Sequence, residues 1–119
     1  MNSILTSIKK LLGITEEYEH FDIDIIMHIN TALASLTQIG VGPAEGFFIE
    51  DSEAAWSDFL GDSQKLESVK TYVYLKVRLI FDPPASSIMM EAMKRNIEEL
   101  EWRLNVEVDK GGEIQNGEK

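Results

Sequence analysis

The sequence predicts an all-α protein, a compact bundle of four to five helices built around a central helical hairpin. The main evidence is residues 66–81, where apolar side chains three and four residues apart form two adjacent rows. A helix with two such rows is apolar around most of its circumference, which predicts a position in the centre of a core. A break at Pro83 and Pro84 is followed by a second helical pattern, so the two stretches together predict an antiparallel pair.

The first helix of this hairpin carries one apolar row at positions 66, 69, 73, 77 and 80 and another at 72, 75 and 79. The two prolines lack an amide hydrogen and disfavour helical geometry in the residue before them, so they predict a rigid turn. The residues that we assign to the structural core are Ile29, Leu33, Trp56, Val73, Val77, Ile80, Pro83, Pro84, Met93, Ile97 and Leu100.

The second helix of the hairpin places its apolar residues at positions 90, 93, 97, 100 and 104. On its other side, opposite charges four residues apart predict a solvated face, each pair contributing about 0.2–0.5 kcal/mol. These pairs are Glu91–Arg95, Lys94–Glu98, Arg95–Glu99 and Glu99–Arg103. The composition then becomes polar, so we divide the chain into a helical domain, residues 1–105, and a flexible polar tail, residues 106–119.

Two further helices precede the hairpin. Residues 2–12 predict a short amphipathic helix, and about eleven residues are marginal for an isolated helix in water. This helix must therefore dock, either on its own core or on a neighbouring protein. Residues 22–39 predict a longer helix with Asp22 as its N-cap, ended by Gly40 and by the Gly42-Pro43 pair.

Residues 41–51 form the least regular segment of the predicted domain. Phe47, Phe48 and Ile49 make a short apolar run that either packs on the core, which we favour, or presents an edge to another subunit. Ser52 predicts the N-cap of a short helix that continues to Leu60. The candidate protein-interaction residues are Ile4, Ile8, Leu11, Leu12, Phe47 and Phe48.

Length and composition indicate one small domain with enough apolar side chains for a core, since 44% of the 119 residues are hydrophobic and 8% are aromatic. The chain has no cysteine, which excludes disulfides, thiolate zinc sites and cysteine nucleophiles. No apolar run approaches the roughly 18 residues of a bilayer span, and the N-terminus lacks a signal-peptide pattern. We therefore expect a cytosolic protein with no membrane partner.

The charge of the chain is unevenly distributed. The net charge is -10, and residues 13–64 contain eleven acidic residues without one lysine or arginine. A negative surface repels nucleic-acid phosphates and attracts basic protein surfaces, so the pattern argues against a protein that grips DNA. Acidic surface that serves only solubility remains an alternative interpretation.

Catalytic and metal-binding patterns are weak. His20, Asp24 and His28 stand four residues apart and could line one side of a helix, but nothing in the pattern excludes water or supplies a further ligand. The acidic groups at residues 16–19 and 98–101 lack the Glu-Glu-x-x-Glu spacing of all-α nucleotide pyrophosphatases. No phosphate loop, serine elbow or His-Glu-x-x-His pair is present. We expect no enzyme, no cofactor and no functional metal.

Three features together carry a family resemblance. Residues 21–26 open the second helix, Trp56 lies in a short helix, and Phe81-Asp82-Pro83-Pro84 ends the long buried helix. With the short N-terminal helix, this order resembles the head-tail connector proteins of tailed bacteriophages and prophages, above all the small all-helical adaptors of the DNA-packaging or head-completion type. The likeness covers residues 1–105 and includes no catalytic motif.

The resemblance implies a structural protein. Connectors of this kind form a ring homo-oligomer beneath the portal protein, extend the DNA channel and provide the docking surface for the next neck or tail-completion protein. DNA is expected to pass through the channel without specific binding. The implied location is the virion neck at the head-tail junction, reached from the host cytoplasm during assembly.

Two other functions are compatible with the residues. An acidic DNA-mimic inhibitor would also lack basic residues over a long stretch and would bind a basic host protein. A helical metal-dependent nucleotide hydrolase would need carboxylates gathered around magnesium, which the spacing does not favour.

Overall fold

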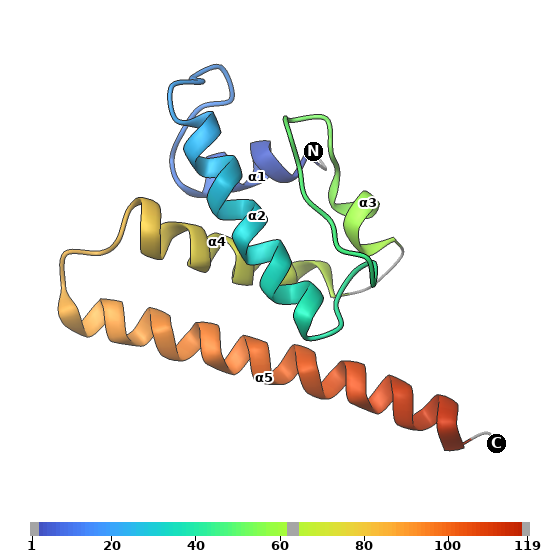
Figure 1. Cartoon of the computed structure of the whole chain (residues 1–119). Coiled ribbons are helices and arrows are strands. Elements are labelled where there is room, and N and C mark those ends of the chain that lie inside the picture. Colours follow the sequence, from blue (N-terminus) through green and yellow to red (C-terminus); the bar gives the residue numbers. More distant parts are fainter. Residues whose placement is uncertain (1–2, 62–64, 118–119) are drawn as a thin grey trace.

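The protein is described by a computed structural model that covers residues 3–61 and 65–117, with side chains described up to Val108. The described chain contains five α-helices (Figure 1). They are α1 (Ile4–Leu11), α2 (Asp22–Gln38), α3 (Trp56–Leu60), α4 (Leu66–Phe81) and α5 (Ser87–Gly117). Within these residues there is no β-strand, only one isolated bridge between Ser3 and Ala55. The all-α prediction is confirmed.

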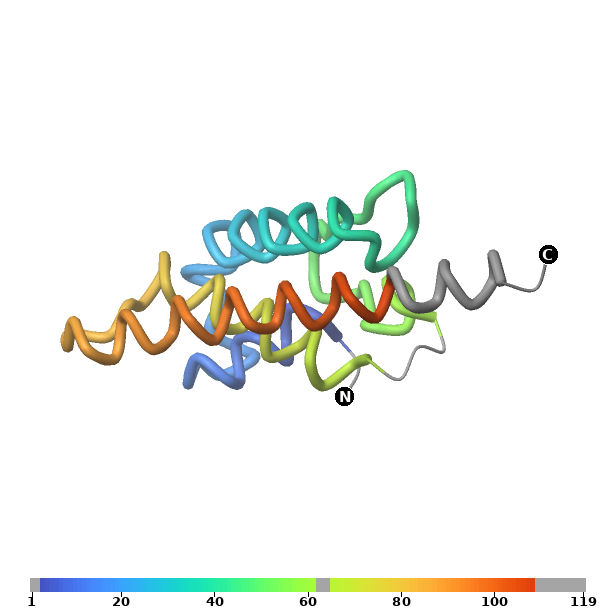
Figure 2. Tube along the Cα trace, turned by 90° about the horizontal axis from the view of Figure 1, so that it is seen from below, coloured from blue at the N-terminus to red at the C-terminus, as the bar shows by residue number. Residues whose placement is uncertain are grey.

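Helix α4 lies in the centre of the bundle. It contacts α1, α2 and α5, and the side chains of Val69, Tyr72, Val73 and Val77 are completely buried. Figure 1 shows α2 crossing α4 and α5 running antiparallel to it. Figure 2, viewed from below, places α1 and α2 at opposite sides of the bundle. Three separate helices thus cover the apolar surface of α4. The contact between α4 and α5 is the helical hairpin predicted from the sequence.

The core contains most of the residues assigned to it from the sequence. Ile29, Leu33, Trp56, Val73, Val77, Met93 and Ile97 are buried, and Leu100 is partly buried against them. Ile80 is instead 56% exposed. The buried row of α4 continues from Val77 to Phe81, four residues on, and the Phe81 ring packs edge-on against Phe21 with centroids 5.2 Å apart. Ile80 therefore lies on the outer side of the last turn.

The two prolines of the hairpin turn differ in their surroundings. Pro84 is buried, whereas Pro83 is exposed, so the assignment of Pro83 to the core is wrong. After the turn, the Ser86 hydroxyl accepts a hydrogen bond from the Met89 N–H at 3.3 Å. A serine oxygen in this position satisfies one of the free N–H groups at the start of a helix, which explains why α5 begins here.

Helix α5 continues past residue 105, where the sequence analysis ends the helical domain. Val108 packs against the core beside Gly40, where an added Cβ would lie only 2.8 Å from the Val108 Cγ1 atom. Residues 106–108 therefore belong to the folded body. The flexibility expected for the rest of the tail concerns residues 109–119, which lie beyond the described side chains.

Two helix starts differ from the sequence prediction. Asp22 is the first residue of α2, not its N-cap, because its carboxylate turns toward Lys9. The short helix α3 begins at Trp56, well after Ser52, and Ala55 precedes it. The Asp58 carboxylate accepts the Ala55 N–H at 2.8 Å, so a residue inside the helix supplies the bond that Ser52 was expected to provide.

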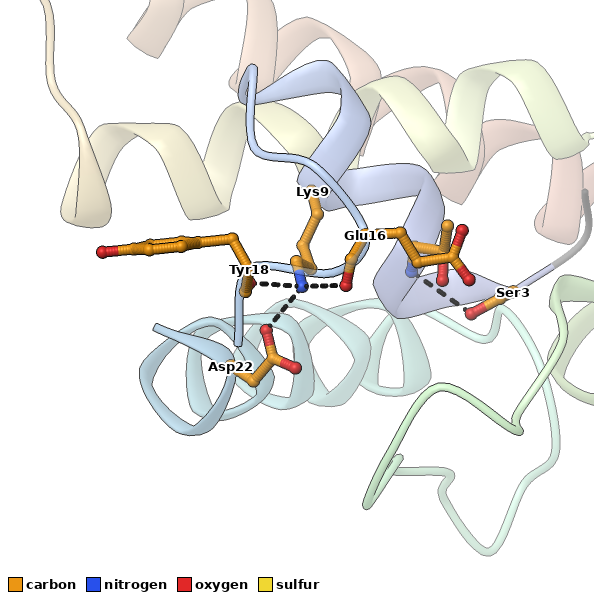
Figure 3. Close-up of polar contacts among 6 residues, drawn as sticks. Ser3, Lys9, Glu16, Tyr18 and Asp22 are labelled. Carbon is orange, nitrogen blue, oxygen red and sulfur yellow. Dashed lines mark hydrogen bonds and ion pairs between the residues drawn. The ribbon is translucent and has the colours of Figure 1, made fainter. Parts of the chain in front are cut away.

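A buried lysine fastens α1 to the start of α2 (Figure 3). Lys9 is only 2% exposed, and its Nζ lies 2.8 Å from the Asp22 Oδ1 atom. The same ammonium donates to the carbonyl oxygens of Tyr18 at 2.8 Å and Glu16 at 3.1 Å. Three acceptors match the three donors of an ammonium group, which offsets the cost of burying its charge.

The long loop between α2 and α3 is anchored from both sides. Asn30 on α2 accepts the Ile49 N–H at 2.7 Å and donates to the Ile49 carbonyl at 3.0 Å. Phe47 packs on Phe59 of α3 with ring centroids 5.4 Å apart. Phe47 and Ile49 therefore lie on the core, as the favoured interpretation expected.

The close approach of Gly42 to α3 makes this loop sensitive to one added methyl group. Gly42 has φ +84°, and a Cβ there would lie 2.4 Å from the Phe59 Cε1 atom. Gly46 is a matched control, because it also has positive φ, +98°, but no atom would lie within 4 Å of its Cβ. We expect Gly46→Ala to cost about 1–2 kcal/mol of unfolding free energy from backbone strain. Gly42→Ala should cost about 1–3 kcal/mol more from overpacking, measured by urea denaturation. Equal losses would contradict the contact.

The Lys9 network predicts a second large effect. Lys9→Met leaves the Asp22 carboxylate without its partner, and removing one member of a buried pair costs about 3–5 kcal/mol. We expect a value near the lower end, because the Asp22 side chain retains 24% exposure. Lys10→Met, at the exposed neighbouring position, should change the free energy of unfolding by less than about 0.5 kcal/mol. Similar values for the two variants in urea denaturation would show that the network is not stabilising.

Candidate protein-interaction surfaces

The candidate interaction residues of α1 divide into two groups. Ile4 and Ile8 are completely buried in the chain's own core, so they are not available to a partner. Leu12 is partly buried, while Leu11 is 47% exposed. The sequence left open whether α1 docks on its own core or on a neighbouring protein. The burial of Ile4 and Ile8 shows that α1 packs on the core of its own chain. Only the side of α1 that carries Leu11 faces outward.

A hollow lies along this outer side of α1. It has a volume of about 430 Å³ and is lined by Thr6, Ser7, Lys10, Leu11 and Glu16 together with Lys70 of α4. We call it the α1–α4 groove. Lys10 is exposed and Lys70 is half-buried, and neither forms an ion pair within the described chain. The groove combines an apolar side chain with two cationic groups and one carboxylate at its edge.

The loop between α2 and α3 presents the opposite chemistry. Its acidic residues Glu45, Glu50, Asp51 and Glu53 are all exposed, and the loop contains no lysine or arginine. Phe48 lies among them with 69% of its side chain exposed, although its neighbours Phe47 and Ile49 are packed. We call residues 45–53 the acidic loop.

Other large apolar side chains are exposed on the remaining faces. Ile23 and Met27 lie on α2, Ile80 lies at the end of α4, and Trp102 lies on the outer side of α5. Ile88 and Met89 are exposed at the start of α5. In total, nine large apolar side chains are exposed on the described chain. Single exposed apolar residues are normal on a protein surface, so their number alone does not indicate a partner. Trp102 was not predicted as a surface residue, although its position outside the row of Ile97, Leu100 and Leu104 indicates the exposed side of the helix.

A buried polar contact links α4 to α5. The Tyr72 hydroxyl donates to the Glu101 Oε2 atom at 2.6 Å, and the Lys76 ammonium lies 5.8 Å from the centre of the Tyr72 ring. Burial, together with the Glu101 carboxylate, raises the pKa of the Tyr72 hydroxyl above its ordinary range. The hydroxyl therefore stays protonated and serves as a donor that fixes the two helices, which is a structural role.

The residues considered as metal ligands do not form a site. In the described part of the chain, no three histidine, aspartate or glutamate side chains gather closely enough to hold a metal ion. His20 packs on Phe21, with ring centroids 4.9 Å apart, rather than facing Asp24 and His28. The Glu101 carboxylate accepts a hydrogen bond from Tyr72, while Glu99 pairs with Arg103 at 2.7 Å, so Glu99 and Glu101 serve separate contacts.

No helix among the described residues is both long and apolar enough to cross a membrane. The described chain thus offers a groove lined by two lysines, an exposed acidic loop and exposed apolar side chains. Such surfaces can bind other protein surfaces by shape and charge.

Comparison with known proteins identifies the family. No curated protein and no solved structure matches the chain. The family model described as phage connector protein matches residues 4–111, which includes all five helix starts and both surfaces described above. A match over almost the whole chain is not a local motif. The chain therefore belongs to the phage connector protein family.

Proposed function

We propose that this protein is a structural subunit of the head-tail connector, in which copies form a ring beneath the portal protein. In this role it extends the DNA channel and provides the docking surface for the next neck or tail-completion protein. The observation that carries the proposal is the family match over residues 4–111. The family supports a structural role in the virion neck, and the proposal includes no catalytic step and no cofactor.

The arrangement of the surfaces supports assembly into a ring. A head-to-tail ring needs two different and complementary patches on each subunit. The α1–α4 groove and the acidic loop differ in charge and share no lining residue, because the groove is formed by α1, Glu16 and Lys70 whereas Glu45 and Phe48 lie against α2. An isologous dimer would instead need one patch that is complementary to itself.

The charge pattern suits a channel through which DNA moves. Proteins that hold DNA pair its phosphates with lysine and arginine, and each such contact makes binding depend on salt. Residues 13–64 contain no lysine or arginine, and their acidic side chains in the α1–α2 connection and the acidic loop are exposed. A wall formed by these segments would repel the duplex, so DNA would slide without being bound.

Electron microscopy of the protein mixed with capsids of its phage tests this role. We expect additional ring-shaped density at the portal vertex after the full chain is added to DNA-filled, tail-less capsids. Capsids without a portal are the control and should gain no density. In a gel-shift assay, the protein should not retard free duplex DNA. This should hold even at low salt, where electrostatic attraction or repulsion is strongest.

Two outcomes would contradict the proposal. One is the absence of any bound density at portal vertices when the protein is present in excess. The other is tight binding to a basic host protein together with indifference to capsids, which would favour the acidic DNA-mimic function instead.

A further inference from the structure

We propose that the acidic loop of one copy docks into the α1–α4 groove of the next copy, with Phe48 as the central contact. The inference rests on the proposed function, because it specifies which surfaces join the subunits of the ring. Its partner is a second copy of this chain.

Phe48 is an exposed aromatic side chain on a rigid support. It is 69% exposed, yet the next residue is held by two hydrogen bonds to Asn30 and the preceding one packs on Phe59. An aromatic residue held in place loses little conformational entropy when it is buried in a partner. This arrangement is typical of a residue that contributes strongly to an interface, because such residues are large and well positioned.

The α1–α4 groove provides a matching cavity. Its volume of about 430 Å³ leaves room for a phenyl ring together with neighbouring loop atoms. Leu11 offers apolar surface, and Lys10 and Lys70 also line the groove. The methylene stems of lysine side chains can extend such an apolar surface. A phenyl ring that enters here would cover the exposed Leu11 side chain, and two apolar surfaces would leave water together.

The charges beside Phe48 match those of the groove. Glu45 and Glu50 flank the ring in the sequence, and neither forms an ion pair within the described chain. Lys10 and Lys70 likewise lack an ion-pair partner there. Complementary charges at the edge of an interface direct association and fix its register. Glu16 opposes this attraction, but the two lysines leave the groove with a net positive charge.

The two surfaces cannot satisfy each other within one chain. The groove is lined by α1, Glu16 and Lys70, and no residue of the acidic loop lines it. Phe48 and Glu45 lie instead against the α2 residues Asn30, Ala34 and Thr37, and the chain returns to the start of α1 only after the loop, where the Ala54 carbonyl accepts the Ile4 N–H at 3.0 Å. Contact between two unlike surfaces is heterologous, and it joins copy to copy into a ring when the rotation between neighbouring copies closes.

Charge reversal in the full-length chain tests the inference. Lys10→Glu with Lys70→Glu makes the groove acidic, and Glu45→Lys with Glu50→Lys makes the loop basic. We expect each double variant alone to associate at least about tenfold more weakly than the natural chain in sedimentation velocity, as expected for loss of interface contacts. An equimolar mixture of the two should associate again, because each variant then supplies a surface that fits the reversed one.

A matched control separates the effect of where the charges are changed from the effect of changing the net charge. Lys94→Glu with Arg95→Glu changes the net charge by the same amount on the outer face of α5, where both residues are exposed. This control should assemble like the natural chain. Circular dichroism and the urea midpoint identify any variant that fails to fold.

Phe48→Ala provides an independent test that leaves every charge in place. It should weaken association at least about tenfold, whereas Ile23→Ala, at an α2 side chain that is 76% exposed, should have little effect.

The outcomes separate this inference from the proposed function. If the natural chain assembles and folded variants of both surfaces assemble equally well, the inference is overturned while the ring remains. If the mixture of the two reversed variants does not associate, the pairing of these surfaces is wrong. If the natural chain neither associates at any concentration nor binds portal-bearing capsids, the proposed function fails and the inference fails with it.

Discussion

The burial of the broad apolar side of α4 is the constraint on which the rest of the structure depends. Val69, Tyr72, Val73, Leu75 and Val77 are all buried, and three helices, α1, α2 and α5, contact α4. Helix α1 has only eight residues and would be marginal alone. It is stable here because Ile4 and Ile8 complete the cover of the core and because Lys9 ties the following connection to α2.

The packing of three helices around α4 determines which surfaces remain exposed. Since α1, α2 and α5 each turn one side inward, their other sides and the long loops are what a partner meets. The connections from α1 to α2 and from α2 to α3 carry exposed acidic residues and, between residues 13 and 61, no lysine or arginine, whereas α4 and the exposed end of α1 carry lysines. A small domain built in this way has surfaces of different charge on different sides, which is the property that directional assembly requires.

The sequence predicted those features that depend on local periodicity. The bounds of α4 and its hairpin with α5 follow from apolar residues spaced three and four positions apart, because the side of a helix that is buried must be apolar. Features that depend on contacts between distant residues were missed. Spacing alone could not show that Phe81 rather than Ile80 meets Phe21, that Lys9 turns inward to three acceptors, or that Asp58 replaces Ser52 at the start of α3. Nor could it show that Phe48, and not Phe47, is the exposed phenylalanine.

The function we propose requires that identical copies associate through two unlike surfaces. Native mass spectrometry of the full chain over a range of concentrations measures this without any partner. A weak contact between small domains predicts monomers at low concentration and a single closed oligomer, larger than a dimer and of one fixed copy number, at high concentration. A stable two-fold dimer at every concentration would contradict the account, because it would mean that the chain associates through one self-complementary surface.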